Sequence, residues 1–299
     1  MNVKEYLNEH DATEIKVGKS GADVYEIDGK YVLKHVVRQR LKEEQFVTYT
    51  REVLFYQNQM IRQRIYLPKV LKAETSENEI LILMKKYRCP ERNAINVELI
   101  QKITKALAAI HTDETPPFMC KGKEKAELLS DQMIKECLSG WKSVLAEHPG
   151  SFSESQLEEL AGKINKLIEW NDSEDRVLVH GDFHWDNLLE DENENILLCD
   201  WQGVNLGGAS GDLSFFLSRL GAEGIQIDEA VFLDSYVDAI WELSGKQMKR
   251  QDIIVHMNAA NVITSFVFWH QYLHHSSEEQ VGDIYSKMIK DFKATKLKK

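Results

Sequence analysis

The sequence predicts an α+β protein, with strands around one helix in its first 90 residues and a larger, mostly helical part after them. Short β-rich runs separated by turn signals occur before residue 90. Apolar residues at helical spacing dominate after it. Between residues 176 and 199, two short apolar runs enclose a polar loop. The 299 residues suffice for one large domain or two lobes with a sizeable core.

The N-terminal part contains five strand candidates and one helix. Apolar residues recur at helical spacing over residues 43–62, which predicts a helix there. Asp28-Gly29 is a hairpin signal between the second and third strands. The expected order is therefore β-β-β-α-β-β. The strand candidates are Glu14–Val17, Val24–Ile27, Tyr31–Val37, Leu67–Lys72 and Glu79–Met84.

After residue 90, apolar residues recur mainly at helical spacing. Val97–His111 is amphipathic, and residues 124–147 and 153–170 are further helical stretches. Arg176–Val179 and Asn195–Cys199 read as short strands, and four more helical stretches follow from Asp212 to the end.

Composition and charge exclude several classes of protein. The net charge is −11, with +3 in residues 1–90 and −14 in residues 91–299, so the chain is a poor partner for nucleic acid. No stretch approaches the roughly 20 apolar residues of a membrane span, and the charged start lacks an apolar signal core. The four scattered cysteines form no CxxC pair. We therefore expect a cytoplasmic protein with reduced thiols.

The segment 177–200, VLVHGDFHWDNLLEDENENILLCD, carries the strongest chemical signal. A hairpin at Glu192–Asn195 would return Asp200 to the polar loop that follows the first strand. That arrangement would bring together a potential base, Asp182, and two oxygen ligands, Asn187 and Asp200. Mg²⁺ prefers oxygen ligands, one or two of them from protein and the rest from phosphate and water.

A P-loop, a different phosphate-binding motif, is disfavoured. Gly18-Lys19-Ser20 resembles the end of a P-loop, GxxxxGK[ST], but Thr13 stands where the first glycine is required. A strand rather than a helix is expected after it. Membership of the P-loop nucleoside triphosphatases is therefore disfavoured.

The HGDxxxxN loop followed by an aspartate at the end of a strand resembles the aminoglycoside phosphotransferase/choline kinase superfamily. These proteins are small-molecule kinases with a protein-kinase-like fold. The resemblance implies a bilobal architecture. Residues 1–87 would form a nucleotide-binding lobe of antiparallel sheet and one helix, and residues 88–299 a larger helical lobe for catalysis and acceptor binding.

The resemblance also implies a role for individual residues. Lys34 would hold the α/β-phosphates of ATP (or GTP), oriented by Glu52, although Glu43 and Glu44 compete for that role. The other implied residues are Ser20 and Gly21 in the loop over the nucleotide, Lys85 and Tyr87 with backbone contacts to the base, Asp182 as catalytic base, Asn187 and Asp200 as Mg²⁺ ligands, and His180 and Asp212 as supports of the catalytic loop. Asp212 could equally be a plain helix N-cap.

The resemblance implies that the acceptor is a small molecule with a hydroxyl group, and the −14 charge of residues 91–299 favours a cationic one. An aminoglycoside-type antibiotic is the first expectation. A metabolic alcohol kinase for choline, ethanolamine or homoserine is the alternative, and a catalytically inactive binding protein is a third. Trp185, Trp269 and Tyr272 are rings that could contact a cation. Trp201-Gln202 departs from the commoner Trp/Phe-Glu and leaves the acceptor open. A monomer or a homodimer is expected.

Overall fold

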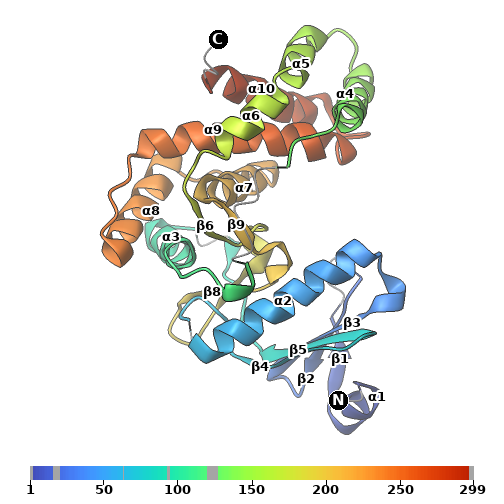
Figure 1. Ribbon diagram of the computed structural model, residues 1–299, viewed down its shortest axis with the longest axis vertical. Helices are drawn as coiled ribbons and strands as arrows, with labels where there is room; N and C mark the ends of the chain where they lie inside the picture. Colours follow the sequence, from blue (N-terminus) through green and yellow to red (C-terminus); the bar gives the residue numbers. More distant parts are fainter. Residues whose placement is uncertain (1–2, 16–20, 63, 93–94, 120–126, 296–299) are drawn as a thin grey trace. The chain divides into compact units, whose positions relative to one another are not determined.

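The computed structural model describes residues 3–15, 21–62, 64–92, 95–119 and 127–295 (Figure 1). Contacts divide the chain into two compact units. The first comprises residues 1–120, 180–182 and 186–205, and the second comprises residues 121–179, 183–185 and 206–299. The division into lobes at residue 87 remains a proposal.

The first unit is built on a five-stranded antiparallel sheet in the order β1-β2-β3-β5-β4. The predicted order β-β-β-α-β-β is confirmed, and a short helix that the sequence analysis did not predict precedes it. The bounds are α1 Val3–Glu9, β1 Ala12–Glu14, β2 Asp23–Ile27, β3 Tyr31–Val37, α2 Glu43–Arg62, β4 Val70–Thr75 and β5 Glu79–Lys85.

The alternation of side chains along β3 and β5 gives the sheet two covered faces. Leu33 and Leu81 pack with Val3 of α1 on one face. Their neighbours in sequence, Lys34 and Ile82, form a cross-strand pair and are also buried. At the β2–β3 turn, Asp28 and Gly29 both have positive φ, as a tight hairpin turn requires.

Helix α3 (Val97–His111) and a β-hairpin complete the first unit. Asn96 caps α3 by accepting a hydrogen bond from the Leu99 amide. The hairpin pairs β7 (Leu188–Glu190) with β8 (Ile196–Leu198), so the expected turn around Glu192–Asn195 is confirmed.

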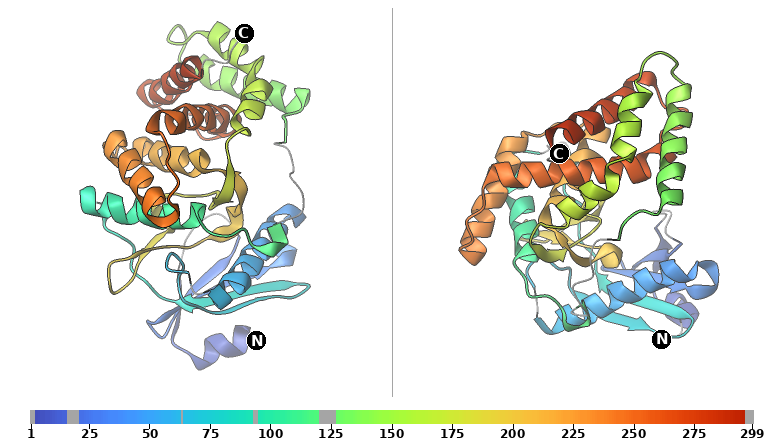
Figure 2. Two further views of the ribbon diagram at one scale, coloured as in Figure 1. Left: turned by 60° about the vertical axis from the view of Figure 1, so that its left-hand side comes forward. Right: turned by 45° about the horizontal axis from the view of Figure 1, so that its top comes forward.

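The second unit is helical. Helix α9 packs against α7, α10, α6 and α4, and Figure 2 shows the helices of this unit from two further sides. A hydrophobic cluster around Trp141 and Phe266 draws its residues from α4, α5, α6, α9 and α10. Trp141 donates its indole N–H to the Phe266 carbonyl at 3.0 Å, which satisfies the polar atom of a fully buried ring. The helices are α4 Asp131–Ala146, α5 Glu154–Ala161, α6 Ile164–Asn171, α7 Ala209–Ala222, α8 Glu229–Ser244, α9 Arg250–Phe268 and α10 Glu278–Ala294. Strands β6 (Arg176–Val179) and β9 (Asn205–Gly208) pair with each other.

Two helix boundaries differ from the sequence expectation. The stretch 153–170 is two helices rather than one, because the chain breaks after Ala161 at Gly162, a poor helix former. Helix α4 begins only at Asp131, where Ser130 accepts a hydrogen bond from the Met133 amide. Four helices follow Ala209, as expected.

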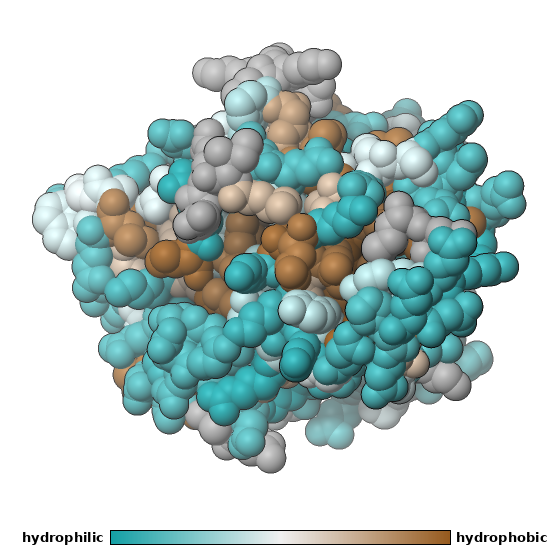
Figure 3. Space-filling view, turned by 90° about the horizontal axis from the view of Figure 1, so that it is seen from below, coloured by the Kyte–Doolittle hydropathy of each residue, from teal (hydrophilic) through white to brown (hydrophobic). Residues whose placement is uncertain are grey.

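Charged residues make up 28% of the chain. Figure 3 shows one face on which hydrophilic residues surround a band of hydrophobic ones. Within the described ranges, none of the helices combines the length and the apolar character needed to span a bilayer.

Candidate active site

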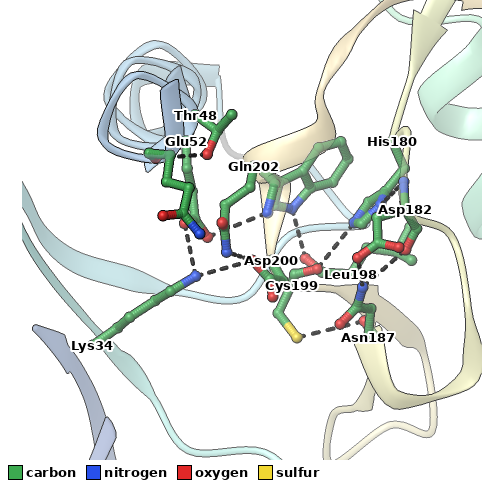
Figure 4. Close-up of polar contacts among 12 residues, drawn as sticks. Lys34, Thr48, Glu52, His180, Asp182, Asn187, Leu198, Cys199, Asp200 and Gln202 are labelled. Atoms are coloured by element: carbon green, nitrogen blue, oxygen red, sulfur yellow. Dashed lines mark hydrogen bonds and ion pairs between the residues drawn. The ribbon is translucent and has the colours of Figure 1, made fainter. Parts of the chain in front are cut away.

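Lys34 and Glu52 form a buried ion pair in the first unit (Figure 4). Lys34 Nζ lies 2.8 Å from Glu52 Oε2, and the Glu52 side chain is fully buried. Glu43 and Glu44, which competed for this role, are exposed at the start of α2, and Glu43 pairs with Arg38 instead. The structure therefore selects Glu52 as the partner of Lys34.

Asp200 is the second carboxylate that contacts the Lys34 ammonium group. Its Oδ1 lies 3.0 Å from Lys34 Nζ, although the two residues are 166 positions apart. Burial would lower the pKa of Lys34, but the carboxylates of Glu52 and Asp200 outweigh it and hold that pKa above its ordinary value. Burial would likewise raise the pKa of Asp200, but the Lys34 cation outweighs it and the pKa stays below its ordinary value. All three groups are close enough to form one charged network.

The polar loop before β7 carries His180, Asp182 and Asn187. The Asn187 side chain donates from Nδ2 to the Asp182 carbonyl at 2.8 Å and lies 3.3 Å from its carboxylate Oδ2. His180 is fully buried, and its Nε2 lies 2.9 Å from the Cys199 carbonyl. The Cys199 amide donates to the Asn187 carbonyl at 3.0 Å. The loop and the residues before Asp200 are thus tied together, as the hairpin prediction required.

Two glycines allow these segments to approach backbone to backbone. Gly181 has φ +78°, and a Cβ placed on it would lie 2.1 Å from the Gly203 carbonyl oxygen. A Cβ on Gly203 would lie 2.9 Å from the Gly181 carbonyl carbon. Neither position has room for a side chain, so HGD requires its glycine for packing as well as for conformation.

The remaining predicted residues are less tightly grouped. Ser20 lies outside the described residues. Gly21 has φ +84°, and a Cβ there would lie 2.6 Å from Leu41 Cδ2. Lys85 ends β5, where its amide donates to the Lys69 carbonyl at 2.9 Å.

Tyr87 and Asp212 are also placed by the fold. Tyr87 accepts a hydrogen bond on its hydroxyl from the Lys69 amide at 3.0 Å. Asp212 is buried in the first turn of α7, where it is the fourth helical residue and Gly208 occupies the N-cap position. It belongs to the second unit, and its support of the catalytic loop stays a prediction.

The oxygen donors fit a magnesium ion. Asp200 offers a carboxylate that is 35% exposed, and Asn187 offers an amide oxygen, because its Nδ2 is used as the donor to Asp182. The described residues contain no cluster of three His, Cys, Asp or Glu side chains that could hold a metal. Mg²⁺ does not need such a cluster where phosphate oxygens and water complete its coordination.

Gln202 and the Trp201 backbone were not predicted as part of this site. The Trp201 amide donates to Glu52 Oε1 at 3.2 Å, so Glu52 binds Lys34 with one oxygen and the Asp200 segment with the other. Gln202 donates from Nε2 to Asp200 Oδ1. The only sequence signal for Gln202 was its departure from the commoner glutamate.

The antiparallel sheet with its helix, the large helical part and the order of these residues define the class: the chain has the fold of the protein-kinase-like small-molecule kinases. The model of the ecdysteroid kinase-like family matches residues 13–244, and the chain belongs to this family. The superfamily resemblance is thereby confirmed. No curated protein matches the sequence.

Solved structures of low sequence identity share the fold. An ADP-bound aminoglycoside phosphotransferase, APH(2'')-Ib, is 16% identical to this chain, with a TM-score of 0.57. The match covers 97% of this chain and 96% of the phosphotransferase chain. An ethanolamine kinase from Plasmodium vivax is 11% identical with a TM-score of 0.61, covering 98% and 83%. Spectinomycin phosphotransferase APH(9)-Ia, bound to ADP and spectinomycin, is 16% identical with a TM-score of 0.56, covering 98% and 93%.

Proposed function

We propose that this protein transfers the γ-phosphoryl group of ATP to a hydroxyl group of a small-molecule acceptor. The observation that carries the proposal is the network in which Lys34 contacts both Glu52 and Asp200. Phosphoryl transfer asks a protein mainly for positioning and for stabilisation of negative charge. A cation held between two carboxylates supplies both, and the relatives with this fold include nucleotide complexes.

Each residue has a distinct role in this proposal. Lys34 binds the α/β-phosphates, and Glu52 holds the ammonium group in place. Asp182 orients the acceptor hydroxyl and receives its proton as the bond to phosphorus forms. Asn187 and Asp200 would hold Mg²⁺, which when bound neutralises charge on the phosphate oxygens. Because the Lys85 amide already donates to Lys69, the contact of Lys85 with the base would use its carbonyl. Ser20, Gly21 and Tyr87 complete the proposed nucleotide site, and His180 and Asp212 support the loop.

Substitution of Asp182 tests the reaction. Asp182→Ala should lower turnover by about 10²–10⁴-fold, because general-base assistance is lost, while ATP binding measured by calorimetry is retained. Asp200→Ala should weaken Mg·ATP binding and turnover together. Asp175→Ala is the matched control, since Asp175 is exposed and its ion pair is with the exposed Lys246. Full turnover in Asp182→Ala would contradict the assignment.

Two observations bear on the class of acceptor, and they favour different compounds. The family's name points to a steroid alcohol. Within the second unit, however, a pocket of about 410 Å³ is lined by Trp269 together with the carboxylates of Glu279 and Asp283 on α10. An indole ring and two carboxylates are suited to an ammonium group, although Lys287, which pairs with Asp291, also lines the pocket. The charge of −14 in residues 91–299 also favours a cationic compound, so an aminoglycoside-type alcohol stays the first expectation, with choline or ethanolamine as the alternative.

Of the rings expected to meet a cation, only Trp269 lines this pocket. Trp185 is buried and stacks near Phe216, with ring centroids 6.4 Å apart. Tyr272 is 72% exposed and does not line the pocket. The indole of Trp269 is therefore the ring to test for acceptor recognition.

A panel of alcohols separates the acceptor hypotheses. ATP consumption should be measured with aminoglycosides, choline, ethanolamine, homoserine and an ecdysteroid, with Asp182→Ala as the blank. Turnover with the cationic compounds would support a cationic acceptor, and a fall of that turnover in Trp269→Ala would support a role for this ring in recognising it. Turnover with the ecdysteroid alone would overturn the cationic acceptor and retain the kinase. ATP binding without turnover on any acceptor would favour the inactive binding protein.

The cytoplasm remains the proposed location. The described cysteines Cys89, Cys137 and Cys199 are free thiols. Burial raises the pKa of Cys199 well above its ordinary value, so it stays protonated and unreactive beside Asp200.

A further inference from the structure

The loop that carries Asp200 holds an unusual backbone conformation. Asp200 has φ +62° and ψ +65°, in the left-handed region that residues other than glycine seldom occupy. Such a conformation persists only where the surrounding contacts impose it. The carboxylate direction of Asp200 therefore depends on its neighbours.

The contacts of Trp201 and Gly203 fix the backbone after Asp200. Trp201 is fully buried, stacks on Phe55 at 4.2 Å between centroids, and donates its indole N–H to the Leu198 carbonyl at 2.8 Å. Its amide donates to Glu52, and Gly203 lies against Gly181. These contacts set the backbone but not the rotation of the Asp200 side chain.

Two donors determine that rotation. Lys34 Nζ and Gln202 Nε2 both bind Asp200 Oδ1, which turns Oδ2 away from them. Lys34 is the residue proposed to bind ATP phosphates, so its bond to Asp200 competes with its bond to substrate. Gln202 is a neutral amide with no such second task, and it can donate to Asp200 throughout the cycle.

We propose that Gln202 is a positioning residue that orients the Asp200 carboxylate for Mg²⁺ and keeps the loop assembled when no metal is bound. The inference rests on the proposed function. A glutamate at this position would place a third carboxylate beside Lys34, whose single charge already offsets Glu52 and Asp200, so a further cation would be needed to offset the repulsion. The amide adds no charge, so the loop is ordered before Mg·ATP arrives.

The test compares Gln202→Ala and Gln202→Glu with the wild-type chain of 299 residues. Loss of an outer partner of a metal ligand typically costs about 10–100-fold in metal affinity. Gln202→Ala should therefore raise the Mg²⁺ concentration that half-saturates ADP binding by about tenfold, measured by calorimetry. ADP is the probe because it binds without turnover.

Thermal unfolding without nucleotide gives a second readout that does not need activity. Gln202→Glu should lower Tm in EDTA by about 3–8 °C, and millimolar Mg²⁺ alone should restore most of it. The wild-type Tm should change little with Mg²⁺. Gln101→Glu, which adds the same charge at an exposed position of α3, controls for net charge.

The outcomes separate this inference from the proposed function. Unchanged Mg²⁺ dependence in Gln202→Ala, or a Gln202→Glu variant that behaves like Gln101→Glu, would overturn the role of Gln202 alone. A wild-type chain that binds no Mg·ADP would overturn the proposed function, and the inference with it.

Discussion

At the scale of single residues, the closest backbone approach in the site depends on Gly181. Its φ of +78° lies in a region that costs other residues roughly 1–2 kcal/mol. The Gly203 carbonyl also occupies the space that a side chain at 181 would need. The two penalties are separable, because Gly150 has a similar φ of +87° and nothing within 4 Å of its Cβ position.

We expect Gly181→Ala to destabilise the protein by more than about 2 kcal/mol, because strain and a backbone clash add. Gly150→Ala should cost only about 1 kcal/mol, because it carries the strain alone. Denaturant unfolding of both variants measures the difference. Equal stability losses would show that the loop at Gly181 moves aside without cost.

At the scale of elements, the β7–β8 hairpin is held by hydrogen bonds within its turn and by ion pairs with other parts of the first unit. Asp191 accepts hydrogen bonds from the Asn193 and Asn195 amides and from Asn195 Nδ2, at 2.9, 2.8 and 3.0 Å. The glutamates of the hairpin pair with cations from elsewhere in the first unit. These pairs are Glu190 with Arg88, Glu192 with Lys85, and Glu194 with Lys102. The hairpin is therefore tied to the end of β5 and to α3.

The turn should matter more than any single surface ion pair. Asp191→Ala removes three hydrogen bonds and should cost about 1–3 kcal/mol, whereas Glu194→Ala should cost little, because water screens its exposed ion pair with Lys102. Burial would raise the pKa of Asp191, but the hydrogen bonds from Asn195 and Asn193 outweigh it and hold that pKa below its ordinary value.

The pH dependence of the Asp191→Ala effect follows from this lowered pKa. A carboxylate whose pKa is lowered by folding contributes its stability above the unfolded pKa, near about 4, and loses it as the pH falls through the folded value. The difference in unfolding free energy between wild type and Asp191→Ala should shrink below about pH 4. A difference that stayed constant to pH 2 would contradict the role of the ionised side chain.

At the scale of the whole molecule, the candidate site residues Lys34, Glu52, Asp182, Asn187 and Asp200 all belong to the first unit, although the chain leaves that unit between residues 121 and 179. The second unit has its own hydrophobic cluster, drawn from α4, α5, α6, α9 and α10. Nucleotide binding should therefore stabilise the two units unequally.

Hydrogen exchange can measure this difference. Saturating Mg·ADP, at about 100 times its Kd, should stabilise the binding unit by about 2.7 kcal/mol. Protection should increase in β3, α2 and residues 186–205 and change much less in α4–α6 and α10. Asp200→Ala should abolish the increase. Equal added protection in both units would indicate that they open as one cooperative body.

The sequence by itself determined the parts of this protein that depend on neighbouring residues. Strand β3 was predicted from its β-rich composition, and helices α2 and α3 were predicted from apolar residues at helical spacing, because each of these helices buries one face. The approach of Asn187 to Asp200 was also predictable, because a short hairpin brings together residues close in sequence.

Only the tertiary structure decided which distant groups meet. Residue spacing does not distinguish Glu43, Glu44 and Glu52 as partners of Lys34, since all three lie on one helix. In the structure Glu52 is the buried partner, and its second oxygen accepts a hydrogen bond from the Trp201 amide. The contact of Gln202 with Asp200 depends on the left-handed backbone at Asp200, which long-range packing of Trp201 and Gly203 imposes. Such contacts have no local sequence signal, because the contacts that impose them come from segments far along the chain.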